Sequence, residues 1–280
     1  MSLRLLSASP RQGAAWVSQA FALFLKKPIA FSALFALFLF AALALLALPY
    51  VGAVLLLMSM PLLSLGFMIA TRSALDGGPV HPGQLVQALR GGDATAAARR
   101  KTLLALCGLY ALTTAVVMLT SDALDGGAFE RLQVLLAGAR DAAAQKEIDA
   151  LLGDPGLLQG MALRLGGTAL LSVPFWHAPA LVWWDGQGVA QALFSSTLAC
   201  WRNRGAFVVY GLAWTLTIML FGITAGGLFA LIGAPQLVGL AAVPAGLMFS
   251  TAFYVSLLFT YRGCFDVETP TQTDGSPAGR

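Results

Sequence analysis

Charged residues are scarce in this chain of 280 amino acids. Asp, Glu, Lys and Arg together make up 11% of it, whereas an average soluble domain carries roughly 25%. The deficit is concentrated in long apolar blocks, and a helix of roughly 20 such residues crosses a bilayer. A transmembrane β-barrel would need short strands of alternating polarity. The chain shows no such alternation, so the sequence indicates a helical membrane protein.

The sequence also lacks the residue patterns of common enzymes and pumps. Asp and Glu are absent from the cores of the apolar blocks, which disfavours a transporter built on an acidic relay. There is no Walker loop, no H-E-x-x-H pair and no Ser/His/Asp arrangement. Cys107, Cys200 and Cys264 stand too far apart to indicate a metal site. We therefore expect a protein that is not an enzyme, with no catalytic residues, no metal and no cofactor.

Six apolar blocks define the predicted fold. We expect transmembrane helices over residues 29–48, 51–70, 103–120, 161–184, 206–233 and 237–261. Between residues 14 and 24, apolar side chains share one arc at about 100° per residue, and such a helix can lie in the membrane interface. Similar stretches occur at 82–98 and 185–204. The predicted class is an all-α polytopic membrane protein with short amphipathic helices on its cytoplasmic face.

The distribution of basic residues predicts the orientation. Lys and Arg are enriched in the cytoplasmic loops of membrane proteins. If the N-terminus is inside, the cytoplasmic parts hold Arg4, Arg11, Lys26, Lys27, Arg72, Arg90, Arg99, Arg100, Lys101, Arg202, Arg204, Arg262 and Arg280. The opposite side holds Arg131, Arg140 and Lys146, with Arg164 near it. We therefore expect a bacterial inner-membrane protein with both termini in the cytoplasm.

The predicted domain organisation is a single transmembrane domain over residues 1–265. It includes an extracytoplasmic helical loop at 121–160 and is followed by a disordered cytoplasmic tail at 266–280, rich in Thr, Ser, Pro and Gly. The layout of amphipathic run, basic turn and two spans recurs over 12–78, 79–184 and 185–265. This indicates a three-unit repeat, although any three helical hairpins with basic inner flanks would share the layout.

One predicted span contains a candidate functional centre. His177 lies inside the fourth span between Pro174 and Pro179, with Trp176 beside it. Ionisable residues within spans usually face a bundle interior or a water-filled cavity, and Pro179 should free a backbone carbonyl one turn earlier. Such a broken helix could bind a substrate, a proton or a lipid headgroup. The alternative, which we favour, is a neutral histidine hydrogen-bonded to a neighbouring helix.

Two basic clusters are candidates for binding anionic lipid headgroups. Arg99, Arg100 and Lys101 precede the third span, and Arg202 and Arg204 precede the fifth. Clusters of Lys and Arg beside amphipathic helices attract acidic headgroups. The alternative, which we favour for these residues taken alone, is that both clusters serve topology only.

Two further features have structural interpretations. Arg164, near the outer end of the fourth span, is expected to extend to the headgroups, and the alternative is a pair with a loop carboxylate such as Asp154. Gly222 and Gly226 stand four residues apart in the fifth span. Small residues at this spacing permit close packing of membrane helices.

One stretch carries a resemblance to known proteins. The segment HAPALVWW at 177–184 is followed by Ala192-Leu193, Ser196, Ala199, Arg202-Asn203, Phe207 and Tyr210. This pattern resembles uncharacterised multi-pass inner-membrane proteins of proteobacteria. They are similar in layout to YciC-type proteins and to the membrane domain of some glycerophosphodiester phosphodiesterases. The resemblance implies topology and an inner-membrane location. It does not carry over the phosphodiesterase activity, because the soluble domain for it is missing here.

These observations favour a non-enzymatic integral membrane protein that organises lipids or membrane partner proteins. The alternative is a transporter or channel for a small or lipidic substrate, acting through the broken fourth helix. The expected partners are the lipid bilayer, its anionic lipids, and another membrane protein or a second copy of the chain. Nucleic acid is not expected, because topology accounts for the net charge of +4.

Overall fold

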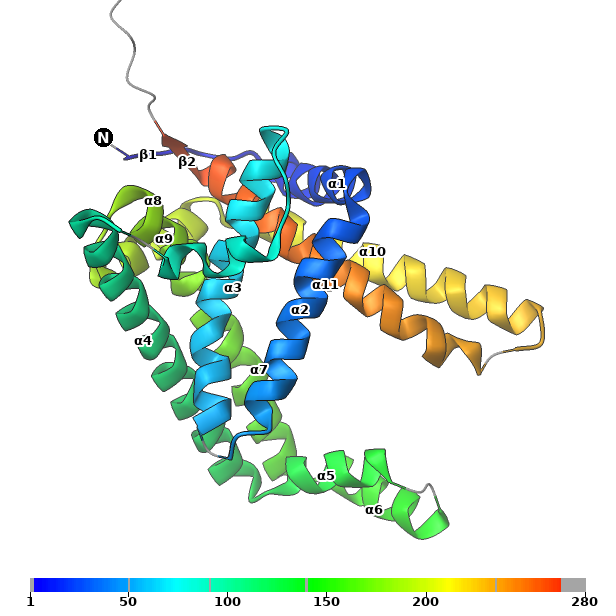
Figure 1. Cartoon of the computed structure of the whole chain (residues 1–280). Helices are drawn as coiled ribbons and strands as arrows, with labels where there is room; N and C mark the ends of the chain where they lie inside the picture. The colour runs from blue at the N-terminus through cyan, green and yellow to red at the C-terminus, as the bar shows by residue number, and fades with distance from the viewer. Residues whose placement is uncertain (1–2, 50, 91, 139–140, 235, 268–280) are drawn as a thin grey trace, which may run out of the picture.

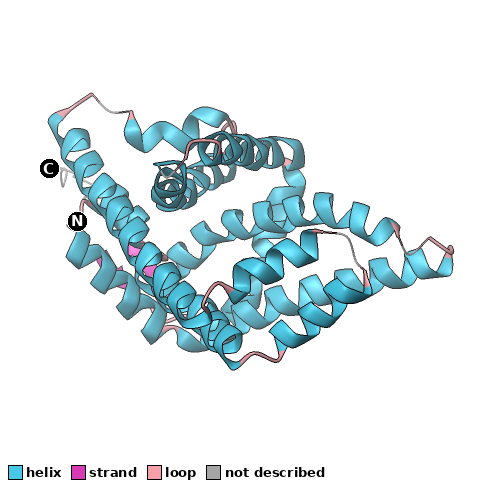
Figure 2. Ribbon diagram, turned by 90° about the horizontal axis from the view of Figure 1, so that it is seen from below, coloured by secondary structure: helices cyan, strands magenta, loops and turns pink. Residues whose placement is uncertain are grey.

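Helices make up nearly the whole of the described chain (Figures 1 and 2). The computed structural model describes residues 3–49, 51–90, 92–138, 141–234 and 236–267. In chain order the elements are β1 (Leu3–Leu5), α1 (Pro10–Lys26), α2 (Pro28–Leu46), α3 (Val51–Leu75), η1 (Pro82–Leu89), α4 (Ala94–Asp125), α5 (Ala128–Ala137), α6 (Ala142–Leu152), α7 (Pro155–Phe175), α8 (Ala178–Asp185), α9 (Val189–Arg202), α10 (Arg204–Leu231), α11 (Leu237–Cys264) and β2 (Phe265–Val267).

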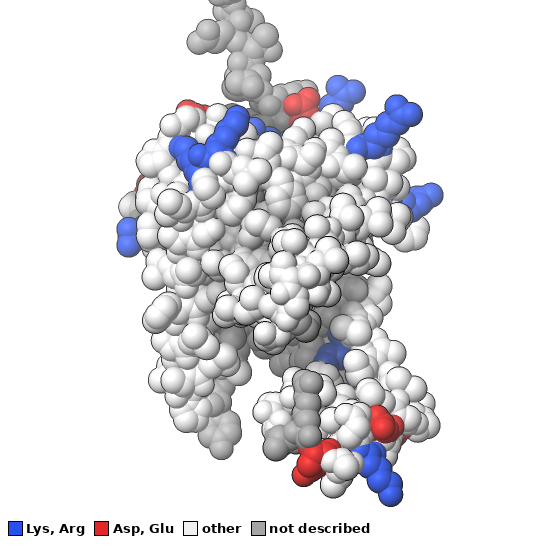
Figure 3. All heavy atoms as spheres, turned by 90° about the vertical axis from the view of Figure 1, so that its right-hand side faces the viewer, with Lys and Arg blue, Asp and Glu red and all other residues white. Residues whose placement is uncertain are grey.

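The predicted all-α membrane class is confirmed. Within the described ranges, six helical segments are long and apolar enough to cross a membrane, namely α2, α3, α4, α7 with α8, α10 and α11. The long helices are flanked at one end by α1, η1, α9 and the β1–β2 pair, which we call the terminal face, and at the other end by α5 and α6 (Figure 1). Lys and Arg side chains gather over the terminal face, and a largely uncharged band follows below it (Figure 3).

The predicted amphipathic stretch at 82–98 is not one helix. It divides into the 3₁₀ helix η1 and the first turn of α4, which begins at Ala94 instead of residue 103. The reason is a helix cap, because the side chain of Asp93 accepts a hydrogen bond from the N–H of Ala96 at 2.6 Å. An aspartate at this position satisfies a donor that the helix start leaves unpaired.

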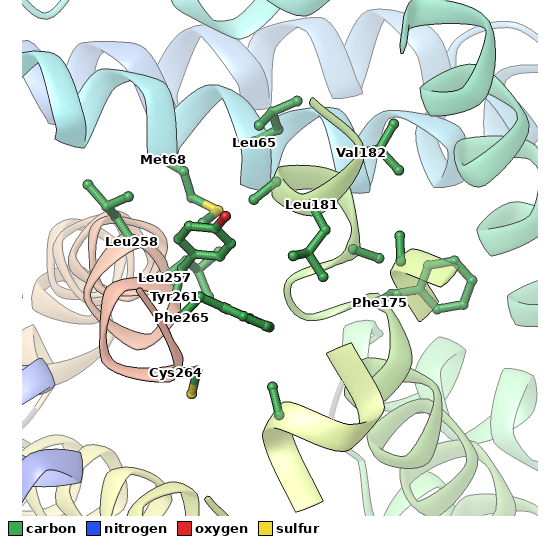
Figure 4. Close-up of a cluster of buried hydrophobic side chains, with 14 of the residues drawn as sticks. Leu65, Met68, Phe175, Leu181, Val182, Leu257, Leu258, Tyr261, Cys264 and Phe265 are labelled. Atoms are coloured by element: carbon green, nitrogen blue, oxygen red, sulfur yellow. The ribbon is translucent and has the colours of Figure 1, made fainter. Parts of the chain in front are cut away.

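The main core lies where α3, α8 and α11 meet beside α7. Leu65 of α3, Leu181 of α8 and Leu258 of α11 are fully or almost fully buried, and all three belong to the cluster of side chains drawn in Figure 4. Because the bilayer is itself apolar, this packing is stabilised by close contact rather than by exclusion of water. The core therefore fixes how the spans fit together around the broken helix.

Helix α1 belongs to the protein core. Its apolar arc, including Trp16 and Ala20, is buried against α10 and α11, whereas the sequence predicted an interfacial helix. The closest approach is at Gly13, where an added Cβ would overlap the carbonyl oxygen of Ala206. Glycine is required there because the two backbones touch. The polar face of α1, with Ser18, points outward.

The two ends of the described chain pair with each other. Strands β1 and β2 are antiparallel, with Leu3 opposite Val267 and Leu5 opposite Phe265. The N–H of Leu6 extends this pairing by donating to the carbonyl of Cys264 at 2.8 Å. The strand thus takes in residues 266 and 267 of the predicted tail, while 268–280 lie outside the described residues. The three-unit repeat stays a prediction.

Helices α10 and α11 leave the bundle as a pair directed away from α4 and α7 (Figure 1). Each has 28 residues, which at ~1.5 Å per residue makes a helix of about 42 Å. This exceeds the ~30 Å hydrocarbon core, so such helices cross with a tilt. Their outer halves expose Leu216, Leu220 and Val243.

The expected close packing at Gly222 and Gly226 is wrong within the described chain, because an added Cβ at either would meet no atom within 4 Å.

The predicted loop at 121–160 is shorter than expected and contains α5 and α6, with residues 139–140 outside the described ranges. Beside it, Arg164 pairs with Asp122 and, at 3.1 Å, with the buried carboxylate of Asp125. Its guanidinium also lies 3.9 Å from the centre of the Phe129 ring. The alternative of a pair with a loop carboxylate is thus confirmed, with Asp122 and Asp125 as partners, and the favoured extension to the headgroups is not observed. Asp154 instead caps α7 by accepting from the N–H of Gly156.

Candidate functional site

The fourth span is broken at residues 176–177, between α7 and α8. In a regular helix the N–H of His177 would donate to the carbonyl of Val173. Here the N–H of His177 donates to the hydroxyl of Ser196 at 3.0 Å, and that hydroxyl donates to Val173 at 2.9 Å. A side chain inserted into the helical ladder is a known cause of a kink. Pro179, which has no N–H to donate back across the break, lies in the first turn of α8.

The ring of His177 is fully buried among protein side chains. Its Nε2 lies 3.3 Å from the hydroxyl oxygen of Thr260 on α11, to which the indole N–H of Trp176 also donates at 3.1 Å. The rings of Phe207 and Phe265 pack around the imidazole. In this geometry the imidazole lies within hydrogen-bonding distance of a neighbouring helix. Pro174 lies in the last turn of α7.

A large cavity lies beside the break, and His177 does not line it. The cavity measures about 940 Å³ and is bounded by α7, α9, α10 and α11. Aromatic side chains dominate its wall, and they are Trp176, Trp201, Phe207, Tyr210, Trp214, Phe249, Phe253 and Tyr254. A smaller cavity of about 200 Å³ adjoins it, shares Ser172, Trp176, Phe253 and Tyr254, and extends to Pro61 of α3 and Tyr110 of α4.

The cavity has a charged rim at the terminal face. Arg204 lines it there, with its guanidinium 5.6 Å from the centre of the Trp201 ring, a cation–π arrangement. The lining continues along α10 to Ile218, fourteen residues or about 21 Å further on. The site therefore runs along α10 from a positive charge at the terminal face into an apolar stretch of the helix.

The structure separates the predicted basic residues. Arg99 donates to the carbonyl of Trp183 at 2.9 Å, and Arg100 donates to the carbonyl of Leu89 at 3.2 Å. These two side chains tie α4 to α8 and η1. Lys101 and Arg202 are exposed. Of the five candidates, Arg204 is the one that lines the cavity.

A buried amide positions the turn that carries Arg204. The side chain of Asn203 is 1% exposed. Its Oδ1 accepts from the N–H of Ala8 at 2.6 Å, and its Nδ2 donates to the carbonyls of Leu6 at 3.2 Å and Ala199 at 3.0 Å. Asn203 thus joins the α9–α10 turn to the N-terminal segment. This support keeps the neighbouring Arg204 at the mouth of the cavity.

Sequence reasoning overlooked most of the cavity wall. Phe207, Tyr210 and Trp214 follow one another at spacings of three and four residues, which places them on one face of α10. The signal in the sequence was this aromatic stripe, in a span whose other faces carry aliphatic residues. Ser196 and Asn203 belonged to the pattern that carried the family resemblance, and both are buried hydrogen-bonding residues.

Comparison with known proteins fits this architecture. A curated protein of Burkholderia thailandensis, described as a probable inner membrane protein, is 33% identical to the chain over 268 residues, or 96% of each of the two chains. No protein-family model matches the chain, and no solved structure gives a significant match. The similarity, together with six apolar helices, identifies a multi-pass protein of the inner membrane. The chain belongs to the same family of inner membrane proteins as this relative.

Proposed function

We propose that this protein is a non-enzymatic membrane protein that binds and organises anionic phospholipid at its terminal face. The observation that carries the proposal is the position of Arg204 at the mouth of an apolar cavity, with Arg202 exposed two residues away. A headgroup phosphate would bind the guanidinium by charge-assisted hydrogen bonds. Each Lys or Arg near an acidic membrane surface contributes about 1 kcal/mol to binding.

The proposal includes the orientation of the chain, with the terminal face and both termini in the cytoplasm. Its support is the gathering of Lys and Arg over that face (Figure 3), because basic residues are retained on the cytoplasmic side. A fluorescent protein fused to the C-terminus should then fluoresce. Alkaline phosphatase inserted between α5 and α6 should be active, and the reverse pattern would contradict the orientation.

The lipid proposal is tested by mass spectrometry of the protein extracted with native lipid in polymer discs. The double variant Arg202→Glu, Arg204→Glu should lose bound acidic lipid. Loss of the two arginine charges alone should weaken the binding free energy of the lipid by about 2 kcal/mol, or roughly 30-fold in affinity. Lys146→Glu, an exposed substitution on α6 at the opposite end, is the control and should retain lipid. Equal lipid content in all three proteins would refute the proposal.

Transport is the second candidate function, favoured by the two cavities that meet beside the broken helix. They share Trp176 and Tyr254, so a rearrangement of these side chains would join the α10 side of the bundle to the α3 side. Proteoliposomes containing labelled lipid test this. Protein-dependent movement between leaflets that is lost in Trp176→Ala, a residue of both cavities, would favour transport, whereas the organiser function predicts no movement.

A further inference from the structure

We infer that the cavity takes up an acyl chain, so that the ligand is a diacyl phospholipid with an acidic headgroup at Arg204 and one chain inside the protein. The inference rests on the proposed function and adds a chemical requirement to it. A headgroup bound by surface charge alone would leave both chains in the bilayer. A chain held inside the protein makes the site selective for intact lipid.

Three of the polar groups in the cavity wall are engaged within the protein. The hydroxyl of Tyr210 is 2.6 Å from that of Ser256, and the indole N–H of Trp176 donates to Thr260. The hydroxyl of Ser172 donates to the carbonyl of Ala169 at 2.6 Å. Among the described residues, the indole N–H of Trp214 is a buried donor without an acceptor. A polar ligand would lose its hydration here for few new hydrogen bonds, whereas a hydrocarbon chain would lose nothing.

The cavity has the size and the opening that an acyl chain needs. Its volume of about 940 Å³ falls at the upper end of the ~300–1,000 Å³ of ligand pockets. Helix α7 packs on α4 and α9, while α10 packs on α1. The walls of the cavity that α7 and α10 form therefore diverge. Val208 and Ile218 line the cavity and are also 61% and 49% exposed. The cavity therefore opens sideways, toward the position of the surrounding lipid.

Charge complementarity selects the lipid over other occupants. The terminal end of the cavity carries Arg204 above its aromatic wall, which matches a phosphate attached to hydrocarbon. A transmembrane helix of a partner or of a second copy would fill the apolar part. To match Arg204, that helix would also have to place an acidic side chain at the rim, whereas an acidic phospholipid always joins its phosphate to hydrocarbon.

The test fills the cavity from two different walls. Gly211 of α10 lines it, and an added Cβ there meets no atom within 4 Å, so Gly211→Trp has room to enter the space. Ala169→Trp enters from α7. Leu212→Trp is the matched control, because Leu212 is 56% exposed and is not part of the wall. The probe is dioleoyl phosphatidylglycerol in native mass spectrometry, with thermal stability measured in parallel.

The expected result is loss of bound phosphatidylglycerol in Gly211→Trp and Ala169→Trp and its retention in Leu212→Trp. If both filled variants retain the lipid while the Arg202, Arg204 double reversal loses it, the acyl-chain inference is overturned and the proposed function stands. If lipid survives in every variant, both fail. If filling the cavity converts an oligomer into a monomer without changing lipid content, the occupant is a second copy and the inference is overturned.

A measurement on the unaltered protein covers the case in which the tryptophan variants do not fold. Phosphatidylglycerol with a photoreactive diazirine near the end of one chain should crosslink to residues of the cavity wall such as Tyr210 and Phe253. Crosslinks confined to outward residues such as Leu216 and Leu220 would overturn the inference.

Discussion

The hydroxyl group of Ser196 replaces a backbone hydrogen bond at His177. It lies 3.0 Å from the backbone nitrogen of His177 and 2.9 Å from the carbonyl oxygen of Val173, two groups that would bond directly in a continuous helix. Helix α9 thereby completes the hydrogen bonding of the break between α7 and α8. In a membrane this matters because the bilayer core offers no water to backbone groups.

Ser196→Ala should destabilise the protein by about 1–3 kcal/mol, because a buried donor and a buried acceptor then lose their common partner. We expect a lower midpoint of thermal unfolding in detergent. Ser195→Ala is the matched control, since Ser195 is a partly exposed neighbour on the same helix. Equal midpoints for the two variants would show that the inserted hydroxyl does not support the break.

Arg164→Leu should lower the free energy of unfolding by about 3–5 kcal/mol, because it leaves the buried carboxylate of Asp125 without its positively charged partner. Adding Asp125→Asn should recover part of that loss, and the recovered part is the coupling energy of the pair. Chemical unfolding of the wild type, both single variants and the double variant measures it. Arg131→Leu, at an exposed position of α5, should be nearly neutral, and strictly additive effects at 164 and 125 would contradict the pairing.

Asn203→Ala should release the N-terminal segment from the α9–α10 turn, because the N–H of Ala8 and the carbonyl of Leu6 lose their hydrogen-bond partner. Amide hydrogen exchange should become faster over residues 3–8 in this variant. Thr197→Ala is the comparison, since that hydroxyl bonds only within α9, to Leu193. Unchanged protection at residues 3–8 would refute the role of Asn203.

The thiol of Cys200 should label slowly with maleimide. Burial raises the pKa of Cys200 to about 12, so below that pH the thiol is protonated and the reactive thiolate is rare. In a Cys107→Ser, Cys264→Ser background, the labelling rate should keep rising from pH 8 to pH 10. An added surface cysteine with a pKa near 8.5 should level off by about pH 9.5. A plateau at pH 9 for Cys200 would show that the thiol is not buried.

The sequence by itself determined the membrane class and the positions of the spans. A backbone in lipid must satisfy its hydrogen bonds within each segment, so an apolar run of sufficient length specifies a helix without reference to other residues. Pro179 marked the fourth span as a candidate for a break, but Pro61, Pro174 and Pro244 lie within continuous helices, so a proline alone did not locate it. The basic flanks that predict orientation are also a local property.

The tertiary structure decided which surfaces meet. The apolar arc of α1 fits either a membrane interface or a protein groove, and only the contact of Gly13 with Ala206 selects the groove. Arg164 pairs with Asp122 and Asp125 because α4 runs beside α7. The cavity exists because α7 and α10 pack on different helices. Such partnerships depend on packing between distant segments, which local hydropathy and spacing do not encode.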